Sequence, residues 1–161
     1  MILSEILRLE RSRIHLNVAH PFIDLYGSVT KTKKRKRVVP ITQNIPRILE
    51  LLRKMDESQD TALPKSILNT ETSNPNAQLN NLFKKIDPAY RTYCTRHSFK
   101  HYLHLSNANH MDVLYLGGWS GKDEKDSRMI ELYAKAGLDE PEMIQRLWDT
   151  AKNAFNWMES K

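Results

Sequence analysis

The 161-residue sequence contains a single cysteine, Cys94, so no disulfide can form within the chain. This excludes the disulfide-bridged secreted scaffolds and the four-cysteine zinc modules. No apolar run approaches the roughly 20 residues that a membrane-spanning helix needs. The first residues also lack the basic-then-apolar layout of a signal peptide. We therefore expect a soluble, cytoplasmic protein that has no membrane partner.

Glycine and aromatic residues are scarce, but the chain has enough apolar residues to build a core. Hydrophobic residues make up 40% and charged residues 27% of the sequence, which excludes collagen-like and wholly disordered chains. The length fits one domain spanning residues 1–161. The formal net charge is +6 and the isoelectric point is about 9.4, which favours an anionic partner such as nucleic acid or an anionic membrane.

Three short segments near the N-terminus are rich in residues that favour strands. They are residues 13–16, 22–26 and 37–41. Close connections between them predict a small three-stranded antiparallel sheet, with Pro40 at a strand end or on an edge strand.

The rest of the chain is predicted to be mostly helical, which gives an α+β fold. A helical stub is expected at residues 2–9. A helix capped by Gln43 or Asn44 should follow the sheet, and further helices are predicted at residues 76–86, 93–106, 111–116, 127–136 and 140–159. The stripe of the 76–86 helix, Leu79, Leu82, Phe83 and Ile86, should face inward. The long apolar stripe of the last helix is expected to dock into an apolar groove, in cis or in trans.

A basic run lies between the second and third predicted strands. Six of the seven residues from Lys31 to Arg37 are Lys or Arg. Such a run is compatible with a solvated tail or a localisation signal. Because it joins two strands, we expect instead a hairpin that contacts DNA phosphates, through Lys33, Lys34, Arg35, Lys36 and Arg37.

A second group of polar residues lies in the helix predicted at residues 93–106. Helical spacing puts Tyr93, Arg96 and Lys100 on one face. Arg96 suits either a surface salt bridge or a guanidinium fork that binds phosphate, and Lys100 is expected to contact DNA. The histidines at positions 97, 101 and 104 share a face, but the glutamate of the metalloprotease pattern is missing. We expect no bound metal.

Two aromatic residues stand out farther along the chain. Trp119 follows Leu116-Gly117-Gly118, where a tryptophan commonly closes a helix end, although its indole N–H can also donate to an anion. Tyr133 lies on a predicted amphipathic helix, where a tyrosine is usually a packing residue. Each of these residues taken alone is explained by packing.

Taken in order, these segments resemble the catalytic domain of tyrosine recombinases, the phage integrase family. The resemblance covers nearly the whole chain. It rests on the following residues, in the order in which the family has its motifs: Ser4-Glu5-Ile6-Leu7-Arg8-Leu9 of the first helix, Lys31 ahead of Arg37-Val38-Val39-Pro40, Tyr93-Cys94-Thr95-Arg96-His97-Ser98-Phe99, Leu116-Gly117-Gly118-Trp119, and Tyr133 before the last helix.

The chain also departs from the family pattern. Ile2 stands where the family has its first catalytic arginine, and Tyr93 stands where it commonly has a histidine. The spacing from Trp119 to Tyr133 is longer than usual, with residues 121–126 as the extra loop. We expect that the 161 residues lack the start of the first helix and the N-terminal domain with which such enzymes clamp DNA.

The resemblance implies site-specific cutting and rejoining of double-stranded DNA, as in integration and excision, without metal or cofactor. Tyr133 would attack a DNA phosphate and form a 3′-phosphotyrosine. Arg96 and Trp119 would donate to the phosphate, and Lys31 would protonate the leaving 5′ oxygen. Tyr93 would replace the proton-handling histidine, and His97 would support the catalytic residues. The family also implies self-association, as a tetramer on DNA.

Two other readings of the sequence remain open. The chain can be a catalytically inactive module of the same fold, kept for DNA binding or assembly, because Ile2 replaces an arginine. It can also be an unrelated basic helical protein that binds RNA or DNA. The order of the motif-like segments argues against this last reading.

Overall fold

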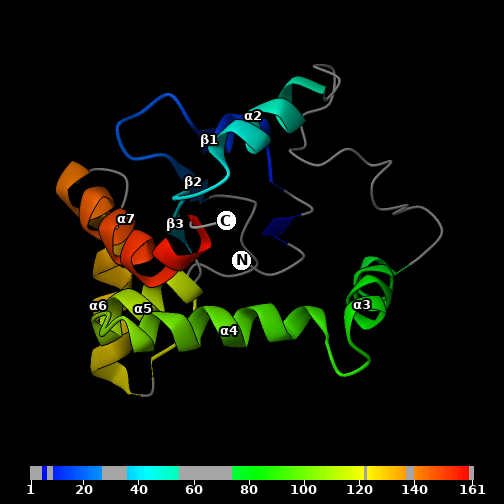
Figure 1. Ribbon diagram of the computed structural model, residues 1–161. Coiled ribbons are helices and arrows are strands. Elements are labelled where there is room, and N and C mark those ends of the chain that lie inside the picture. The colour runs from blue at the N-terminus through cyan, green and yellow to red at the C-terminus, as the bar shows by residue number, and fades with distance from the viewer. Residues whose placement is uncertain are drawn as a thin grey trace.

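A computed structural model describes residues 5–6, 9–26, 36–54, 74–121, 123–136 and 140–159 (Figure 1). In these residues the chain is mostly helical with one small sheet, so the coarse α+β prediction is confirmed. None of the described helices is both long and apolar enough to cross a membrane. Of the helical stub predicted at residues 2–9, the structure describes Glu5 and Ile6, which are helical, and Leu9, which is not.

The sheet has three antiparallel strands in the order β1-β2-β3, as predicted. A short 3₁₀ helix η1 (Arg11–Arg13) leads into β1 (Ile14–His15), which is followed by β2 (Phe22–Leu25) and β3 (Arg37–Pro40). Pro40 pairs with Phe22 at the end of β3, an edge strand, where the missing N–H costs no ladder hydrogen bond. The register also sets Arg37 opposite Leu25, which places both side chains on one face of the sheet.

Six α-helices follow the sheet in the described residues. They are α2 (Ile45–Lys54), α3 (Pro75–Ile86), α4 (Thr92–Leu105), α5 (His110–Gly117), α6 (Glu124–Ala136) and α7 (Pro141–Phe155), and a 3₁₀ helix η4 (Asn156–Glu159) continues α7. All were predicted within a few residues, except that α6 begins at Glu124 rather than Ser127. The Asp123 carboxylate accepts a hydrogen bond from the Asp126 N–H at 2.8 Å, so three residues assigned to a loop form the first helical turn.

Asparagine caps fix the starts of two helices. Asn74 accepts from the Asn76 N–H at 3.0 Å and precedes Pro75 in the first turn of α3. Asn109 accepts from the Met111 N–H at 2.8 Å at the start of α5. At α2, the Asn44 backbone carbonyl accepts from Ile48 at 2.9 Å, whereas the Gln43 side chain donates to the Phe155 carbonyl.

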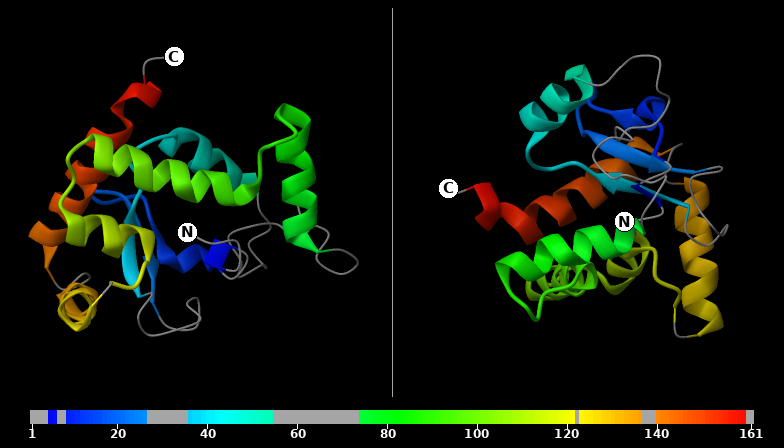
Figure 2. Two further views of the ribbon diagram at one scale, coloured as in Figure 1. Left: turned by 90° about the horizontal axis from the view of Figure 1, so that it is seen from below. Right: turned by 90° about the vertical axis from the view of Figure 1, so that its right-hand side faces the viewer.

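Helix α7 supplies much of the core. Its buried residues, Met143, Leu147, Ala151 and Ala154, recur every three or four positions. Three of them, Met143, Leu147 and Ala154, pack with Leu103 of α4 and with apolar residues of α5. Contacts between α7 and β3 join this helical layer to the sheet (Figure 2). The last helix therefore docks in cis, one of the two arrangements that the sequence left open.

Two tyrosines connect the sheet to the helices. The edge strand β3 donates its Val38 N–H to the Tyr115 hydroxyl at 2.9 Å, which satisfies a backbone donor that lacks a strand partner. The Tyr26 hydroxyl donates to the Ala134 carbonyl of α6 at 2.6 Å. Burial raises the pKa of Tyr115 well above its ordinary value, so its phenol stays neutral and available as a hydrogen-bonding bridge.

Helix α3 stands apart from the rest of the fold (Figure 1 and the left view of Figure 2). Its junction with α4 is fixed by Asn80, whose side-chain oxygen accepts from the Thr92 N–H at 2.9 Å. The prediction that its apolar stripe faces inward is wrong at two positions, because Leu82 is 53% and Ile86 is 76% exposed. Amphipathic spacing identified the helix but not what its stripe faces.

Candidate functional site

Two cationic side chains of α4 lie over one tryptophan ring. The Arg96 guanidinium carbon is 4.4 Å from the centre of the Trp119 ring, and the Lys100 amine is 5.6 Å from it. The ring centre of Phe99, on the same helix, lies 6.5 Å from that of Trp119. Each cation is attracted to the ring face, but the two charges repel each other. Two positive charges at one ring give this platform of Arg96, Lys100 and Trp119 the sign of charge that attracts an anionic ligand.

Two consecutive glycines let this platform form at the end of α5. A side chain on Gly117 would meet the Trp119 ring at 1.7 Å. Gly118 has a φ of +60° and ends the helix, and a Cβ there would lie 2.6 Å from the Arg37 guanidinium. The Gly-Gly pair is therefore required by two large side chains, the Trp119 ring packed on one glycine and Arg37 packed on the other.

Arg37 is buried and ion-paired, so the prediction that it contacts DNA is wrong. Its two terminal nitrogens donate to the two carboxylate oxygens of Glu5 at 3.1 and 2.9 Å, and both side chains are 1% exposed. Its Nε donates to the Leu116 carbonyl at 3.1 Å. The basic run ends at a strand whose pleat turns its first side chain inward.

Tyr133 lies in a second cluster, formed by α5, α6 and α7. Its ring is 5.6 Å from that of Tyr115 and 5.2 Å from the Arg146 guanidinium carbon, and it lies close enough to the Asp112 carboxylate to influence its pKa. The buried Asp112 carboxylate pairs with Arg146 at 2.9 Å. The structure thus gathers Arg96, Lys100 and Trp119 in one group and holds the Tyr133 hydroxyl in another.

Asp112 and Arg146 were not predicted from the sequence. Asp112 carries a weak signal, because it is the one acidic residue in the short α5 and is followed by the apolar run Val113 to Leu116. Arg146 lies beside buried positions of α7, between Met143 and Leu147. Their pairing joins residues 34 positions apart, which spacing alone does not reveal.

The pocket beside Tyr133 is apolar with an acidic rim. It lies between α6 and α7, has a volume of about 350 Å³, and is lined by Met129, Leu132, Tyr133, Glu140, Glu142, Met143 and Arg146. Two glutamates oppose the single arginine, which Asp112 already pairs. This pocket is therefore a poorer place for a phosphate than the platform at Trp119.

Asp112 should make folding stability depend on pH. Burial raises its pKa above the ordinary 3.8, against the opposing effect of Arg146. The folded state therefore holds this proton more tightly than the unfolded state. The resulting stabilisation is full below the ordinary pKa and is lost as pH rises through the raised pKa.

We expect the Asp112→Asn variant not to lose this stabilisation as the pH rises. Urea denaturation between about pH 3 and 7 measures its free energy of unfolding. Asp24→Asn, which removes a carboxylate paired with Arg13 at 3.0 Å, is the control. Identical pH slopes for the wild type and Asp112→Asn would contradict this assignment.

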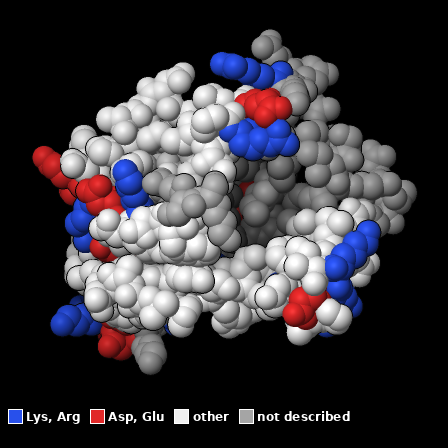
Figure 3. All heavy atoms as spheres, viewed as in Figure 1, with Lys and Arg blue, Asp and Glu red and all other residues white. Residues whose placement is uncertain are grey.

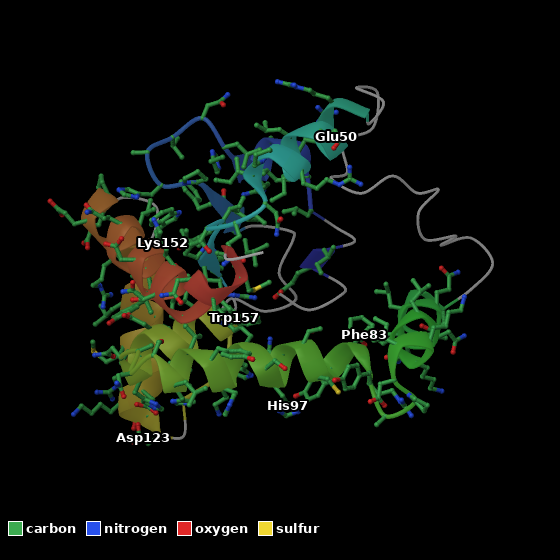
Figure 4. The ribbon with its side chains drawn as sticks, in the orientation of Figure 1. Glu50, Phe83, His97, Asp123, Lys152 and Trp157 are labelled. Carbon is green, nitrogen blue, oxygen red and sulfur yellow. The ribbon has the colours of Figure 1, made fainter. Side chains whose placement is uncertain are left out.

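The remaining predicted residues are placed as follows. Tyr93 is 60% exposed, and its ring meets that of the exposed His97 edge-on at 4.7 Å, on the side of α4 that faces away from the sheet (Figure 4). Lys36 is partly exposed just before β3. Four predicted residues, Lys31, Lys33, Lys34 and Arg35, lie outside the described part of the chain.

The charged side chains of the described residues on the face shown in Figure 3 do not form one basic patch. Lys and Arg side chains are scattered over it and alternate with Asp and Glu. Across the described ranges, no three His, Cys, Asp or Glu side chains come close enough to hold a metal ion. Among the described residues, the feature that suits an anion is the platform of Arg96, Lys100 and Trp119.

Comparison of the chain with family models, with curated proteins and with solved structures gave no match.

Proposed function

We propose that the chain is a tyrosine recombinase catalytic domain that cuts and rejoins double-stranded DNA. The Tyr133 hydroxyl gives its proton to water, and its oxygen forms a bond to phosphorus while the bond from phosphorus to the 5′ oxygen breaks. Lys31 supplies a proton to the leaving oxygen. Attack by the 5′ hydroxyl of another strand reverses these steps, so the bond energy is retained without a cofactor.

One observation carries the proposal: four of the five motif-like segments meet in space. Glu5 binds Arg37 across 32 positions, and Arg37 binds the Leu116 carbonyl across 79 positions. The segment that begins at Leu116 carries Trp119, whose ring lies 4.4 Å from the Arg96 guanidinium of a fourth segment. These four segments thus form one contact network, whereas the fifth, which carries Tyr133, lies in the cluster of Asp112 and Arg146.

The roles within the network follow from its chemistry. Arg96 is fixed against an aromatic ring, so its guanidinium is preorganised to donate to a phosphate oxygen. Lys100 adds a second positive charge at the same ring. By the resemblance, Tyr93 and His97 flank this site from the same helix, and self-association on DNA brings several such sites to two duplexes.

A second candidate function is a catalytically inactive DNA-binding module of the same fold. It is favoured by the position of Tyr133, whose ring packs against Arg146 and not at the Trp119 platform, and by Ile2 at the position of the family's first arginine. Both candidates bind DNA at the Trp119 platform. They differ in whether Tyr133 forms a covalent bond to DNA.

DNA binding should be weak and strongly dependent on salt. If about four to six phosphates are neutralised, log K should fall with log salt with a slope of roughly −4 to −5. Replacing Lys33, Lys34, Arg35 and Lys36 with alanine should flatten this slope without unfolding the chain. Replacing Arg96 and Lys100 should reduce it by about 2.

Fluorescence anisotropy with a labelled duplex, titrated at several salt concentrations, provides the measurement. The double variant Arg47→Ala/Arg128→Ala removes the same amount of charge from α2 and α6, where each arginine pairs with a glutamate of its own helix, and it serves as the control. The proposed function fails if binding does not respond to salt, or if the control lowers the slope as much as the loss of Arg96 and Lys100 does.

A further inference from the structure

The backbone that carries Trp119 is fixed at the end of α5 by two crossed hydrogen bonds. The Trp119 N–H donates to the Leu114 carbonyl, and the Gly118 N–H donates to the Tyr115 carbonyl, both at 3.0 Å. With Gly118 at a φ of +60°, this is the arrangement that commonly ends a helix. It leaves the Leu116 carbonyl at the negative end of the helix, where a cation is stabilising.

Arg37 supplies that cation from the sheet. Its Nε donates to the Leu116 carbonyl at 3.1 Å, and its guanidinium packs where a Gly118 side chain would otherwise be. Glu5 binds the two remaining guanidinium nitrogens, so the fork is held on both sides. A lysine at position 37 would present one donor group in place of the planar fork and would fail to hold both partners.

We propose that Arg37, fixed by Glu5, is a positioning residue that sets the place of Trp119 and, through it, of the Arg96 guanidinium. The buried Glu5–Arg37 ion pair, which we call the strut, joins the sheet to the end of α5. The Trp119 ring then lies on Gly117 and offers its face to Arg96 and Lys100. The consequence for catalysis rests on the proposed function, whereas the strut itself does not.

The strut can be tested without DNA, because the chain has three tryptophans that report on different places. Trp119 lies at the platform, Trp148 donates to the Ile41 carbonyl at 3.2 Å, and Trp157 lies against Tyr102 at 4.9 Å, where the end of α7 meets α4 (Figure 4). Uniform labelling with 5-fluorotryptophan gives one ¹⁹F resonance for each, assigned by single Trp→Phe variants.

The informative variant is Glu5→Met/Arg37→Met in the full chain. Replacing both partners of a buried ion pair with apolar residues of similar size commonly keeps a protein folded. We expect the Trp119 resonance to shift or broaden in this variant while those of Trp148 and Trp157 stay in place. Arg37→Lys should shift the same resonance, since lysine does not restore the fork.

The matched control is Arg13→Met/Asp24→Asn, which removes an ion pair between η1 and β2 and should leave all three resonances unmoved. The proposal is overturned if the double methionine variant is folded and keeps the wild-type Trp119 resonance. It is also overturned if all three resonances move together, because the pair would then support the fold in general. A chain that passes this test but shows no salt-dependent DNA binding would retain the strut and lose the proposed function.

Discussion

Replacing Arg37 with methionine is expected to lower the free energy of unfolding by about 3–5 kcal/mol. The substitution leaves the Glu5 carboxylate buried without its cation and the Leu116 carbonyl without its side-chain donor. Burying an unpaired charge is among the costliest single changes in a folded protein. Urea denaturation followed by circular dichroism measures the loss as a lower midpoint at unchanged slope.

The double variant Glu5→Met/Arg37→Met separates this cause from a simple loss of packing. With both charges removed, most of the lost stability should return, because no unpaired charge remains in the core. Arg13→Met, at a pair whose arginine side chain is 24% exposed, should cost less than Arg37→Met. Equal losses for Arg37→Met and the double variant would show that the guanidinium stabilises the fold through packing and not by pairing with Glu5.

Restoring arginine at position 2 should raise the rate of covalent adduct formation with DNA by roughly 10² to 10³, by analogy with other donors that stabilise a developing oxyanion. In that background, Arg96→Ala should lower the rate by a similar factor, because the donor held over Trp119 is lost. A nicked duplex traps the adduct, and denaturing electrophoresis at timed intervals gives the rate.

Tyr93→Phe and Tyr102→Phe should leave part of this activity, whereas Tyr133→Phe should abolish it. A full rate in the Arg96→Ala variant would remove Arg96 from the catalytic group. A full rate with Ile2 in place would show that another residue supplies the missing donor or that the first helix was aligned wrongly.

The elements predicted correctly from the sequence are those whose apolar periodicity and capping residues agree with how they pack in the structure. The stripe of α7 has the right period and is buried, and Asn74 and Asn109 are caps with good local chemistry. The stripe of α3 has the same period, yet Leu82 and Ile86 are exposed. Periodicity reports the shape of a helix but not whether another element covers it.

The site was predicted less completely, for reasons that are geometric. Arg37 looked like the last residue of a basic loop, although its register opposite Leu25, a core position, would have marked it as inward-facing. The grouping of Arg96 with Trp119 depended on a resemblance. The Asp112–Arg146 pair depends on how α5 and α7 cross, which no local pattern encodes.

The central claim is that Tyr133 forms a covalent bond to DNA. The most direct test incubates the chain carrying Ile2→Arg with nicked duplexes of randomised sequence around the nick, recovers DNA that stays attached to protein after denaturation, and maps the modified residue by mass spectrometry. The account predicts a nucleotide on Tyr133 and no attached DNA from Tyr133→Phe. Attachment at another residue, or DNA binding without any attachment, would contradict it.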